Sequence, residues 1–314
     1  MNTALITGVS GYLGSHLAKA LKKSGWKIVG LDKKDCHNPY VDVFVQEDIC
    51  NRSEIFRLFD RVHFDVVFHL AGRIEVGESV KDPVEFYRNN TQGTITLLDV
   101  MKYFGVDKIV YSSTAGVYQS KLEKLTETDE VNPFNNPYAG SKYCAELAIR
   151  QSGVKHVIFR YFNLAGADPE NEMGECHEPE THLIPRILQN LNNFTIYGND
   201  YDTPDGTCVR DYVHVSDIAD AHVLASNYLM NENGSQILNL GTGKGYSVQD
   251  IVNLVKKITG QEVKYRYESR RAGDPPFLFA DVSLAEKVLT YRPKHDIVSI
   301  IQTAYNWQTK NDNT

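Results

Sequence analysis

The chain begins with a short aliphatic run that leads directly into a glycine-rich turn and then into a helical pattern. Residues 3–9 read as a strand, three glycines follow with the spacing G-x-x-G-x-x-G, and leucines then recur every four residues from Leu13. The glycines are Gly8, Gly11 and Gly14. Glycine is needed where a backbone turns sharply and where a phosphate must approach the N-terminus of a helix. The pattern predicts a strand, a phosphate-binding turn and a crossover helix.

The same alternation continues through the first half of the chain. Further runs that read as strands are 27–31, 43–46, 65–70, 108–112 and 154–160. Helical spacing separates most of them, and a βαβ series of this kind implies an α/β fold with a doubly wound parallel sheet. The segment 32–42 is too short for a crossover helix, so we expect a loop there.

The alternation weakens near residue 165, which predicts two domains. We expect a Rossmann-like dinucleotide-binding domain over residues 1–165 and a smaller α/β ligand-binding lobe over 166–314. A strand at 237–240, followed by Gly-Thr-Gly and a helix from Ser247, indicates that the segment around 212–245 returns to the main sheet.

Charge and cysteine content narrow the class of protein. The 33 basic residues against 40 acidic ones leave a net charge of −7, which argues against nucleic acid as a partner. The five cysteines form no C-x-x-C pair, a pattern that favours reduced thiols and a cytoplasmic protein. No apolar run approaches the roughly 18 residues of a membrane span, so we expect no membrane partner.

Acidic and small residues follow the predicted strands where a dinucleotide would lie. Asp32 ends the second strand, where a carboxylate accepts hydrogen bonds from the adenosine ribose and repels a 2′-phosphate. This favours NAD, although Lys33 and Lys34 keep NADP open. The carboxyl ends of the third and fourth strands carry Asp48, Ile49, Leu70, Ala71 and Gly72, at the edge where ligands of open α/β sheets collect.

A tyrosine and a lysine four residues apart form the candidate catalytic pair. Tyr138 and Lys142 lie on one face of a helix that Pro137 can start. A phenol acts as a base near neutral pH only if its anion is stabilised, and an ammonium one turn away does this by Coulomb attraction. Thr114 ends a strand after Ser112 and Ser113, and its hydroxyl can bridge a substrate hydroxyl and the Tyr138 oxygen.

In this order the motifs resemble the extended short-chain dehydrogenase/reductase superfamily and, within it, the UDP-glucose 4-epimerase (UDP-galactose 4-epimerase) family. The segments that carry the resemblance span nearly the whole chain: 7–16, 76–80, 89–90, 138–142, 160–163, 197–201, 205–207, 209–215 and 271–274. The motifs of the first half are common to the superfamily, whereas those of the second half are typical of nucleotide-sugar enzymes.

The resemblance implies an isomerase that inverts C4 of a UDP-hexose through a 4-keto intermediate, with NAD tightly bound and not consumed. The cofactor residues would be Gly8, Gly11, Tyr12, Leu13, Gly14, Asp32, Lys33, Asp48, Ile49, Leu70, Ala71, Gly72, Asn89, Ser112, Tyr138, Lys142 and Phe162. The substrate residues would be Thr114, Asn163, His182, Leu183, Tyr197, Arg210, Tyr212, Arg271, Asp274 and Leu278.

Some of these residues have implied individual roles. Arg210 and Arg271 would clamp the diphosphate, Asp274 would take the uridine ribose hydroxyls, and Tyr197 would flank the base. The second lobe would thus bind the UDP-sugar. The resemblance also suggests a homodimer through the Tyr138 helix and the helix of residues 84–105.

Three features depart from the family pattern. Ile74 stands where the family often has a lysine that holds the cofactor phosphates, and the connection 32–48 is shorter than in many members. Leu278 is smaller than the tyrosine of some members, so we expect some tolerance of N-acetylated sugars.

Several alternative functions stay open. The nearest are 4-epimerases of UDP-N-acetylglucosamine, UDP-glucuronate or UDP-xylose. Dehydratases and decarboxylases are less favoured, because Ala115 and Gly116 follow Thr114 where an acid/base pair or a glutamate would stand. A non-catalytic NAD(H) or nucleotide-sugar sensor would typically lose the Tyr138 and Lys142 pair. We expect no metal, because Cys176, His177 and His182 lack a fourth ligand at standard spacing.

Overall fold

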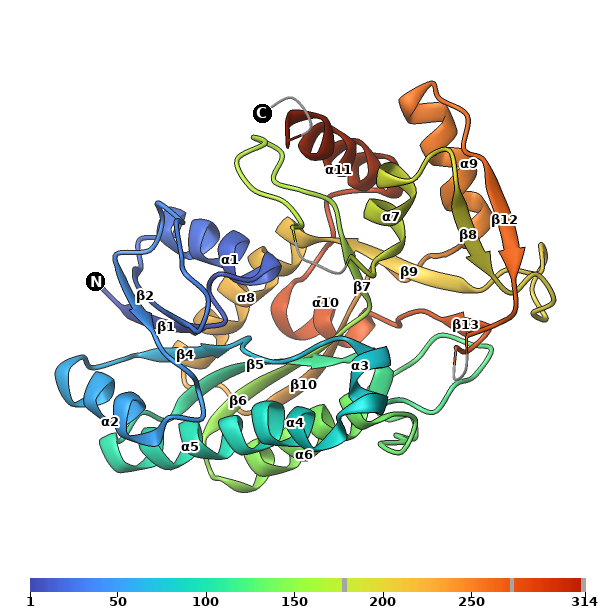
Figure 1. Ribbon diagram of the computed structural model, residues 1–314. Helices are drawn as coiled ribbons and strands as arrows, with labels where there is room; N and C mark the ends of the chain where they lie inside the picture. Colours follow the sequence, from blue (N-terminus) through green and yellow to red (C-terminus); the bar gives the residue numbers. More distant parts are fainter. Residues whose placement is uncertain (177–179, 272–273, 312–314) are drawn as a thin grey trace. The chain divides into compact units, whose positions relative to one another are not determined.

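The computed structural model describes residues 1–176, 180–271 and 274–311 (Figure 1). Its contacts divide the chain into two compact units. The first comprises Met1–Gln119, Glu130–Arg160 and Ala219–Leu238, and the second comprises Ser120–Asp129, Tyr161–Ile218 and Asn239–Thr314.

A seven-stranded sheet organises the first unit, in the order β10-β6-β5-β4-β1-β2-β3. The strands are β1 (Thr3–Thr7), β2 (Lys27–Asp32), β3 (Val43–Gln46), β4 (Val66–His69), β5 (Lys108–Thr114), β6 (Lys155–Tyr161) and β10 (Gln236–Leu240). The pairs β1–β2, β1–β4, β2–β3 and β4–β5 are parallel. The predicted fold class, a doubly wound α/β sheet, is confirmed.

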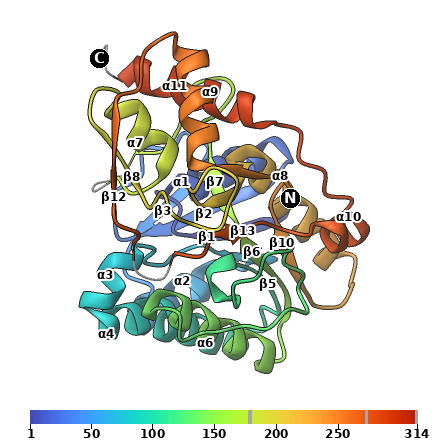
Figure 2. The same ribbon diagram turned by 90° about the vertical axis from the view of Figure 1, so that its right-hand side faces the viewer.

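Helices cover both faces of this sheet. They are α1 (Tyr12–Lys23), α2 (Arg52–Arg61), α3 (Val76–Lys81), α4 (Pro83–Phe86), the π-helix η1 (Tyr87–Gln92), α5 (Gly93–Phe104), the 3-10 helix η2 (Ala115–Val117), α6 (Pro137–Gln151) and α8 (Val215–Met230). Figures 1 and 2 show α2, α5 and α6 along one face and α1 and α8 along the other. The connection 33–42, every residue of which is described, contains no helix, as the sequence predicts.

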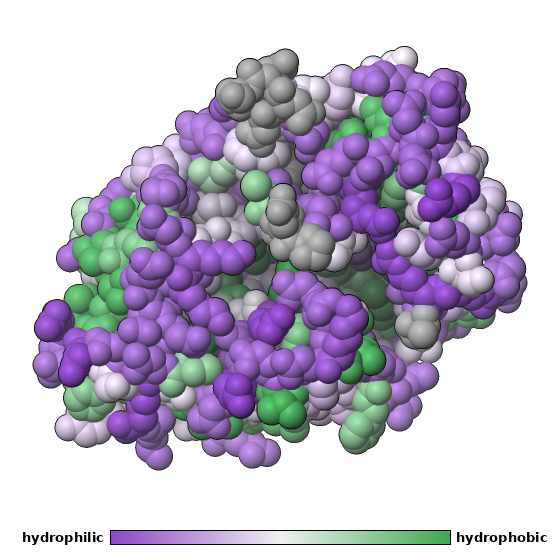
Figure 3. Space-filling view, in the orientation of Figure 1, coloured by the Kyte–Doolittle hydropathy of each residue, from purple (hydrophilic) through white to green (hydrophobic). Residues whose placement is uncertain are grey.

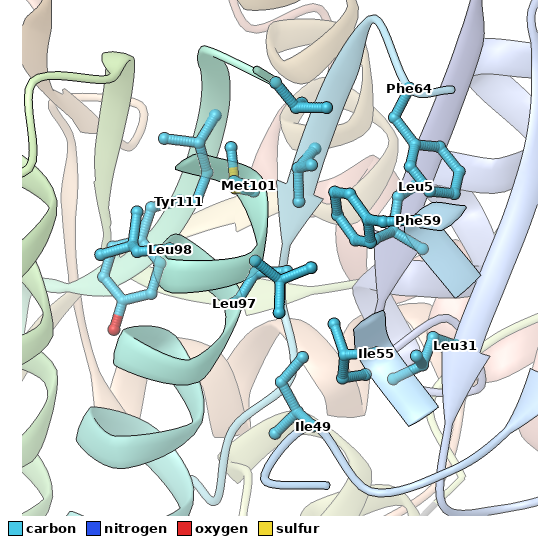
Figure 4. Close-up of a cluster of buried hydrophobic side chains, with 14 of the residues drawn as sticks. Leu5, Leu31, Ile49, Ile55, Phe59, Phe64, Leu97, Leu98, Met101 and Tyr111 are labelled. Atoms are coloured by element: carbon cyan, nitrogen blue, oxygen red, sulfur yellow. The ribbon is translucent and has the colours of Figure 1, made fainter. Parts of the chain in front are cut away.

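The core beneath α2 and α5 explains why the central strands are apolar on both sides. Leu5 of β1, Leu97 of α5 and Ile55 of α2 are fully buried in one cluster, which also includes Phe59 and Tyr111 (Figure 4). A parallel sheet covered on both faces requires such continuous hydrophobic strands. The core therefore fixes the positions at which the strands end, and those ends carry the predicted cofactor residues.

In the part of the second unit that the structure describes, short strands pack with four helices. Strand β9 (Val209–His214) pairs with β11 (Gly245–Ser247), β13 (Phe277–Leu278) and β7 (Asn163–Ala165), while β8 (Phe194–Tyr197) pairs with β12 (Tyr265–Glu268). The helices are α7 (Leu183–Gln189), α9 (Val248–Thr259), α10 (Ser283–Leu289) and α11 (Ile297–Asn311). Ser247 begins α9 through a capping box with Asp250, which fixes the helix start that the sequence predicts.

Figure 3 shows one face of the molecule. The face shown in Figure 3 is predominantly hydrophilic, with hydrophobic groups scattered among charged ones. Within the described residues, each helix is too short or too polar to cross a lipid bilayer.

Candidate active site

The glycine turn between β1 and α1 has no room for a side chain at Gly8 or Gly14. Gly8 adopts a left-handed φ of +76°, and a Cβ added there would lie 2.7 Å from the backbone nitrogen of Ala71. A Cβ on Gly14 would lie 2.1 Å from the Gly8 carbonyl oxygen. Gly11 occupies the N-cap of α1 and supplies no side chain there. The first amides of this 12-residue helix are therefore open to an anion such as a pyrophosphate.

Asp32 connects the end of β2 to this turn. Its carboxylate accepts hydrogen bonds from the backbone N–H groups of Ser10 and Lys34, each at 3.0 Å. Lys33 extends its ammonium to within 3.5 Å of the Asp48 carboxylate. Burial works against ionisation of Asp48, but a backbone hydrogen bond from Cys50 and the charge of Lys33 lower the pKa of Asp48 overall. The predicted residues Asp32, Lys33 and Asp48 thus share one end of the sheet.

An asparagine that the sequence reasoning missed ties the Gly72 loop to α6. Asn90 accepts from the Arg73 N–H at 2.8 Å and donates to the Arg73 carbonyl at 3.0 Å and to Ser141 Oγ at 2.9 Å. A Cβ on Gly72 would lie 3.4 Å from the Lys142 nitrogen. The predicted residue of this pair was Asn89, which is buried.

Helix α6 presents the catalytic pair because its start is fixed. The Asn136 side chain accepts from the Ala139 N–H at 2.8 Å, and Pro137 occupies the first turn. Tyr138 then lies beside Thr114, and their side chains form a hydrogen bond. Burial raises the pKa of Tyr138, the hydrogen bond from Thr114 lowers it, and the charge of Glu75 raises it further, so the net shift is upward.

Lys142 is buried one turn further along α6. Its nitrogen lies 4.6 Å from the centre of the Tyr111 ring. Burial lowers the pKa of Lys142 to about 7, against the opposing charge of Glu146. Burial, with the nearby charge of Lys142, lowers the pKa of His69 to about 3, so His69 is neutral at physiological pH. In its protonated form, Lys142 would supply the positive charge that a Tyr138 phenolate requires.

The second unit gathers arginines around Tyr197. The Arg271 guanidinium lies 4.2 Å from the centre of the Tyr197 ring, and that of Arg186 lies 5.8 Å from the same ring. Arg210 donates to the Pro275 carbonyl at 2.8 Å and lies 3.5 Å from the Asp274 carboxylate. Arg186 was missed, although its place one turn after His182 in α7 was visible in the sequence.

Leu278 and a buried aspartate flank Arg210. Leu278 lies directly opposite Arg210 in the β9–β13 pairing. The neighbouring Asp211 is buried, and its carboxylate accepts from the N–H groups of Thr242 at 2.8 Å, Gly243 at 2.9 Å and Ala280 at 3.2 Å. Asp211, another residue missed from sequence, thus fixes β9 against the segment that carries Leu278.

Comparison with known proteins shows which family has this arrangement of residues. The NAD dependent epimerase/dehydratase family matches residues 4–241. The UDP-glucose 4-epimerase of Lacticaseibacillus casei is 44% identical over 319 residues, 97% of this chain and 96% of that protein. The chain belongs to the NAD dependent epimerase/dehydratase family and, within it, to the UDP-glucose 4-epimerases. The predicted family is confirmed.

Solved structures of UDP-glucose 4-epimerases have the same fold as this chain. The UDP-glucose 4-epimerase from Brucella ovis in complex with NAD has a TM-score of 0.91 at 40% identity and covers 98% of both chains. The enzyme from Bifidobacterium longum in complex with NAD+ and UDP has a TM-score of 0.93 at 34% identity and covers 99% of both.

The position that departs from the epimerase pattern is exposed in this chain. Ile74 has 45% of its surface exposed. The neighbouring Arg73 lies with its guanidinium 4.9 Å from the centre of the Phe86 ring. The Arg73 guanidinium therefore contacts the Phe86 ring, which belongs to the same unit.

Several further predicted residues lie in the second unit. Tyr212 is packed in the hydrophobic core, and burial raises its pKa. The N–H of Phe162 donates to the Leu240 carbonyl at 3.1 Å, and Asn163 pairs with Tyr212 between β7 and β9. His182 precedes Leu183, the first residue of α7, and its ring bonds to Glu175 rather than to a cysteine. His177 lies outside the described residues.

Proposed function

We propose that this protein is an NAD-dependent UDP-glucose 4-epimerase that interconverts UDP-glucose and UDP-galactose. One observation carries the proposal. Thr114 and Tyr138 are hydrogen-bonded, and a buried Lys142 lies one turn along the same helix, in a chain that belongs to this family. Inversion of C4 needs a group that removes and returns the proton of the C4 hydroxyl, and this arrangement supplies it.

The chain's own residues account for the proton chemistry. Tyr138, as the phenolate, takes the proton of the C4 hydroxyl, and Thr114 orients that hydroxyl by hydrogen bonding. The Lys142 ammonium stabilises the phenolate, because it favours the charged form by Coulomb attraction. NAD, held at the glycine turn and by Asp32, would supply the acceptor and donor of the C4 hydride. The reaction has no net redox change.

The first unit fits a dinucleotide at the glycine turn. The glycines at positions 8 and 14 let the turn pack closely against the first turn of α1, whose N-terminal amides can bind a pyrophosphate. The Asp32 carboxylate accepts two backbone N–H groups, and an ionised carboxylate has about four acceptor sites, so it can also accept ribose hydroxyls. A 2′-phosphate would meet this negative charge, which favours NAD over NADP.

The second unit supplies groups suited to UDP. Arg210 and Arg271 present guanidinium groups for the diphosphate, and Asp274 presents a carboxylate for the uridine ribose. Tyr197, whose ring centre lies 4.2 Å from the Arg271 guanidinium, would flank the base. UDP takes no part in the chemistry, so its binding energy can be used to hold the sugar while its two faces are presented in turn.

The test is substitution of the catalytic phenol. Tyr138→Phe removes one oxygen and is expected to lower kcat for UDP-galactose by about 100-fold to 10,000-fold. Binding of NAD and UDP, measured by calorimetry, should stay close to that of the wild-type protein. Near-normal turnover by Tyr138→Phe would overturn the role of Tyr138, because another group would then have to act as the base.

Leu278 favours a second candidate substrate class, the N-acetylated UDP-hexoses. A leucine opposite Arg210 has less bulk than a tyrosine, which leaves more volume for a 2-substituent of the sugar. Parallel assays of UDP-N-acetylglucosamine and UDP-glucose with wild-type protein and Leu278→Tyr test this. We expect the substitution to reduce only the N-acetyl activity, and absence of that activity in the wild type would remove the candidate. UDP-glucuronate and UDP-xylose belong in the same assay.

Two other functions are less well supported. The N–H of Gly116 donates to Thr114 Oγ1 at 3.0 Å, so a tight turn with two small residues follows Thr114 where a dehydratase would place an acid/base pair. A non-catalytic sensor has no use for a buried lysine beside a hydrogen-bonded tyrosine. Bound cofactor without turnover of any UDP-sugar would favour the sensor.

Exposed apolar side chains on α4 and α5 support a homodimer. Val84, Ile95 and Tyr103 have 64%, 43% and 70% of their surfaces exposed. A second copy of the chain would remove this surface from water. Light scattering of the wild-type protein, with Ile95→Glu as the comparison, tests the assembly. We also place the protein in the cytoplasm, because its five cysteines form no C-x-x-C pair.

A further inference from the structure

A buried ion pair lies one turn beyond Lys142. Glu146 of α6 and Arg160 of β6 are 0% and 2% exposed. Two parallel hydrogen bonds join them, Arg160 Nε to Glu146 Oε1 at 3.1 Å and Arg160 Nη2 to Glu146 Oε2 at 2.7 Å. Burial works against the Arg160 charge, but the hydrogen bonds to Glu146 more than compensate and raise the pKa of Arg160. The Arg160 guanidinium is therefore charged at neutral pH.

The pair also reaches the strand end that carries the reacting hydroxyls. Ser113 Oγ donates to the Glu146 carboxylate, and Ser113 stands between Ser112 and Thr114. The Arg160 guanidinium lies 4.8 Å from the centre of the Tyr118 ring, just after η2. One carboxylate thus connects α6, the end of β5, and β6.

Such a pair is not needed for stability alone. Apolar residues of similar volume often replace buried ion pairs with no loss of stability, because the desolvation of the two charges offsets their attraction. A role that requires the negative charge itself therefore accounts better for Glu146.

We propose that Glu146 is a positioning residue for the epimerisation, which keeps Lys142 charged in its buried site and holds Thr114 against Tyr138. The inference rests on the proposed function of the Tyr138 and Lys142 pair. Glu146 lies at the i+4 position from Lys142, on the same face of α6, and its carboxylate opposes the loss of the Lys142 proton.

The other groups around Lys142 provide no such charge. From β4 the buried His69 is neutral, and from β5 the Tyr111 ring contacts the ammonium. Tyr138 shares the α6 face and becomes negative only in its reactive form. Glu146 in turn faces Ser113 of β5, Arg160 of β6 and, through its charge, His156 of β6. Glu146 is therefore the group whose neutralisation should lower the protonation of Lys142 most.

The test is a direct titration of Lys142 in protein labelled with carbon-13 at the lysine Cε, with Lys142→Met identifying the signal. Glu146→Gln is expected to shift the Lys142 midpoint to lower pH by about one unit. The high-pH side of the kcat profile should move to lower pH with it. Glu146→Asp keeps the charge, so its Lys142 midpoint should lie close to that of the wild type. A midpoint in Glu146→Gln equal to that of the wild type would overturn the proposal.

Two further variants separate a positioning role from general damage. Asp217→Asn removes a buried carboxylate that pairs with His295 in the second unit, so it should lower the unfolding free energy without moving the Lys142 midpoint. If Glu146→Gln does not fold, Ser113→Ala carries the test, with an expected several-fold fall in kcat at nearly constant KM. Wild-type kcat in Ser113→Ala would then overturn the proposal.

The titration does not depend on turnover. If the wild-type protein proved inactive on every UDP-sugar, the proposed function would fail while the effect of Glu146 on Lys142 could still be observed. If the wild type is active and the midpoint does not move, only the role of Glu146 fails.

Discussion

Gly14 lies so close to Gly8 that a Cβ on Gly14 would be 2.1 Å from the Gly8 carbonyl oxygen. This separation is shorter than any contact that real Cβ atoms make, and the neighbouring atoms are backbone, which cannot swing aside. The first turn of α1 therefore packs directly on the loop that precedes it. The same contact holds the α1 amides in place for a pyrophosphate.

Gly14→Ala is expected to weaken NAD binding strongly and to lower the unfolding free energy by about 1–3 kcal/mol, the usual effect of overpacking. Urea unfolding and calorimetric titration with NAD measure the two effects. Gly77→Ala is the matched control, because a Cβ there meets no atom within 4 Å. Equal behaviour of the two variants would contradict the packing described here.

Lys142 should make the stability of the cofactor-free protein depend on pH. Burial lowers its pKa to about 7, whereas an unfolded lysine titrates near 10.5. Between these values the unfolded chain binds more protons than the folded one, so the contribution of Lys142 to the unfolding free energy rises with pH. Between pH 7 and pH 9.5, the unfolding free energy measured by thermal or urea unfolding should rise less in Lys142→Met than in the wild type. An identical increase in both proteins would be inconsistent with a buried, easily deprotonated lysine.

Asp32 is expected to determine cofactor choice. Asp32→Asn removes a negative charge that accepts from Ser10 and Lys34, and a hydrogen bond to a charged group contributes about 1.5–3 kcal/mol. The affinity for NAD should fall by about 10-fold to 100-fold, and the preference for NAD over NADP should narrow. Asp35→Asn, a nearby exposed carboxylate that accepts from Cys36, should change neither. Unchanged selectivity in Asp32→Asn would count against this role.

Two adjacent arginines should differ sharply in their effect on UDP binding. Arg271 lies over Tyr197, whereas Arg270 lies over Tyr201 and pairs with Asp200. Arg271→Ala is expected to weaken UDP binding by about 10-fold to 100-fold, because a charged contact to the diphosphate is lost. Arg270→Ala should have little effect on the dissociation constant. The reverse order of effects would mean that the assignment of the two arginines is wrong.

Much of the fold could be predicted from local pattern. The apolar strands, the glycine turn and the loop at 33–42 follow from residue type and spacing, and so does the start of α6 at Asn136 and Pro137. The π-helix η1 could not be predicted, because the pattern of residues 87–92 is also compatible with an ordinary helix. The packing of Ser120–Asp129 with the second unit depends on contacts distant in sequence, which periodicity does not report.

The candidate site was predictable where chemistry is local. Tyr138 and Lys142 are one helical turn apart, so spacing alone brings them together. Asn90, Asp211 and Glu146 were missed because each acts through partners on other elements, and a single asparagine or carboxylate in a sequence does not indicate a buried network. Such residues can be identified only when the structure shows which strands and helices are neighbours.

The decisive measurement is incubation of the purified wild-type protein, with no cofactor added, separately with UDP-galactose and with UDP-glucose, followed by proton NMR of the sugars. If the protein inverts C4 with retained NAD, both reactions should converge on the same mixture of the two UDP-sugars. No conversion in either direction, even after NAD is supplied, would contradict the assignment of this chain as a UDP-glucose 4-epimerase.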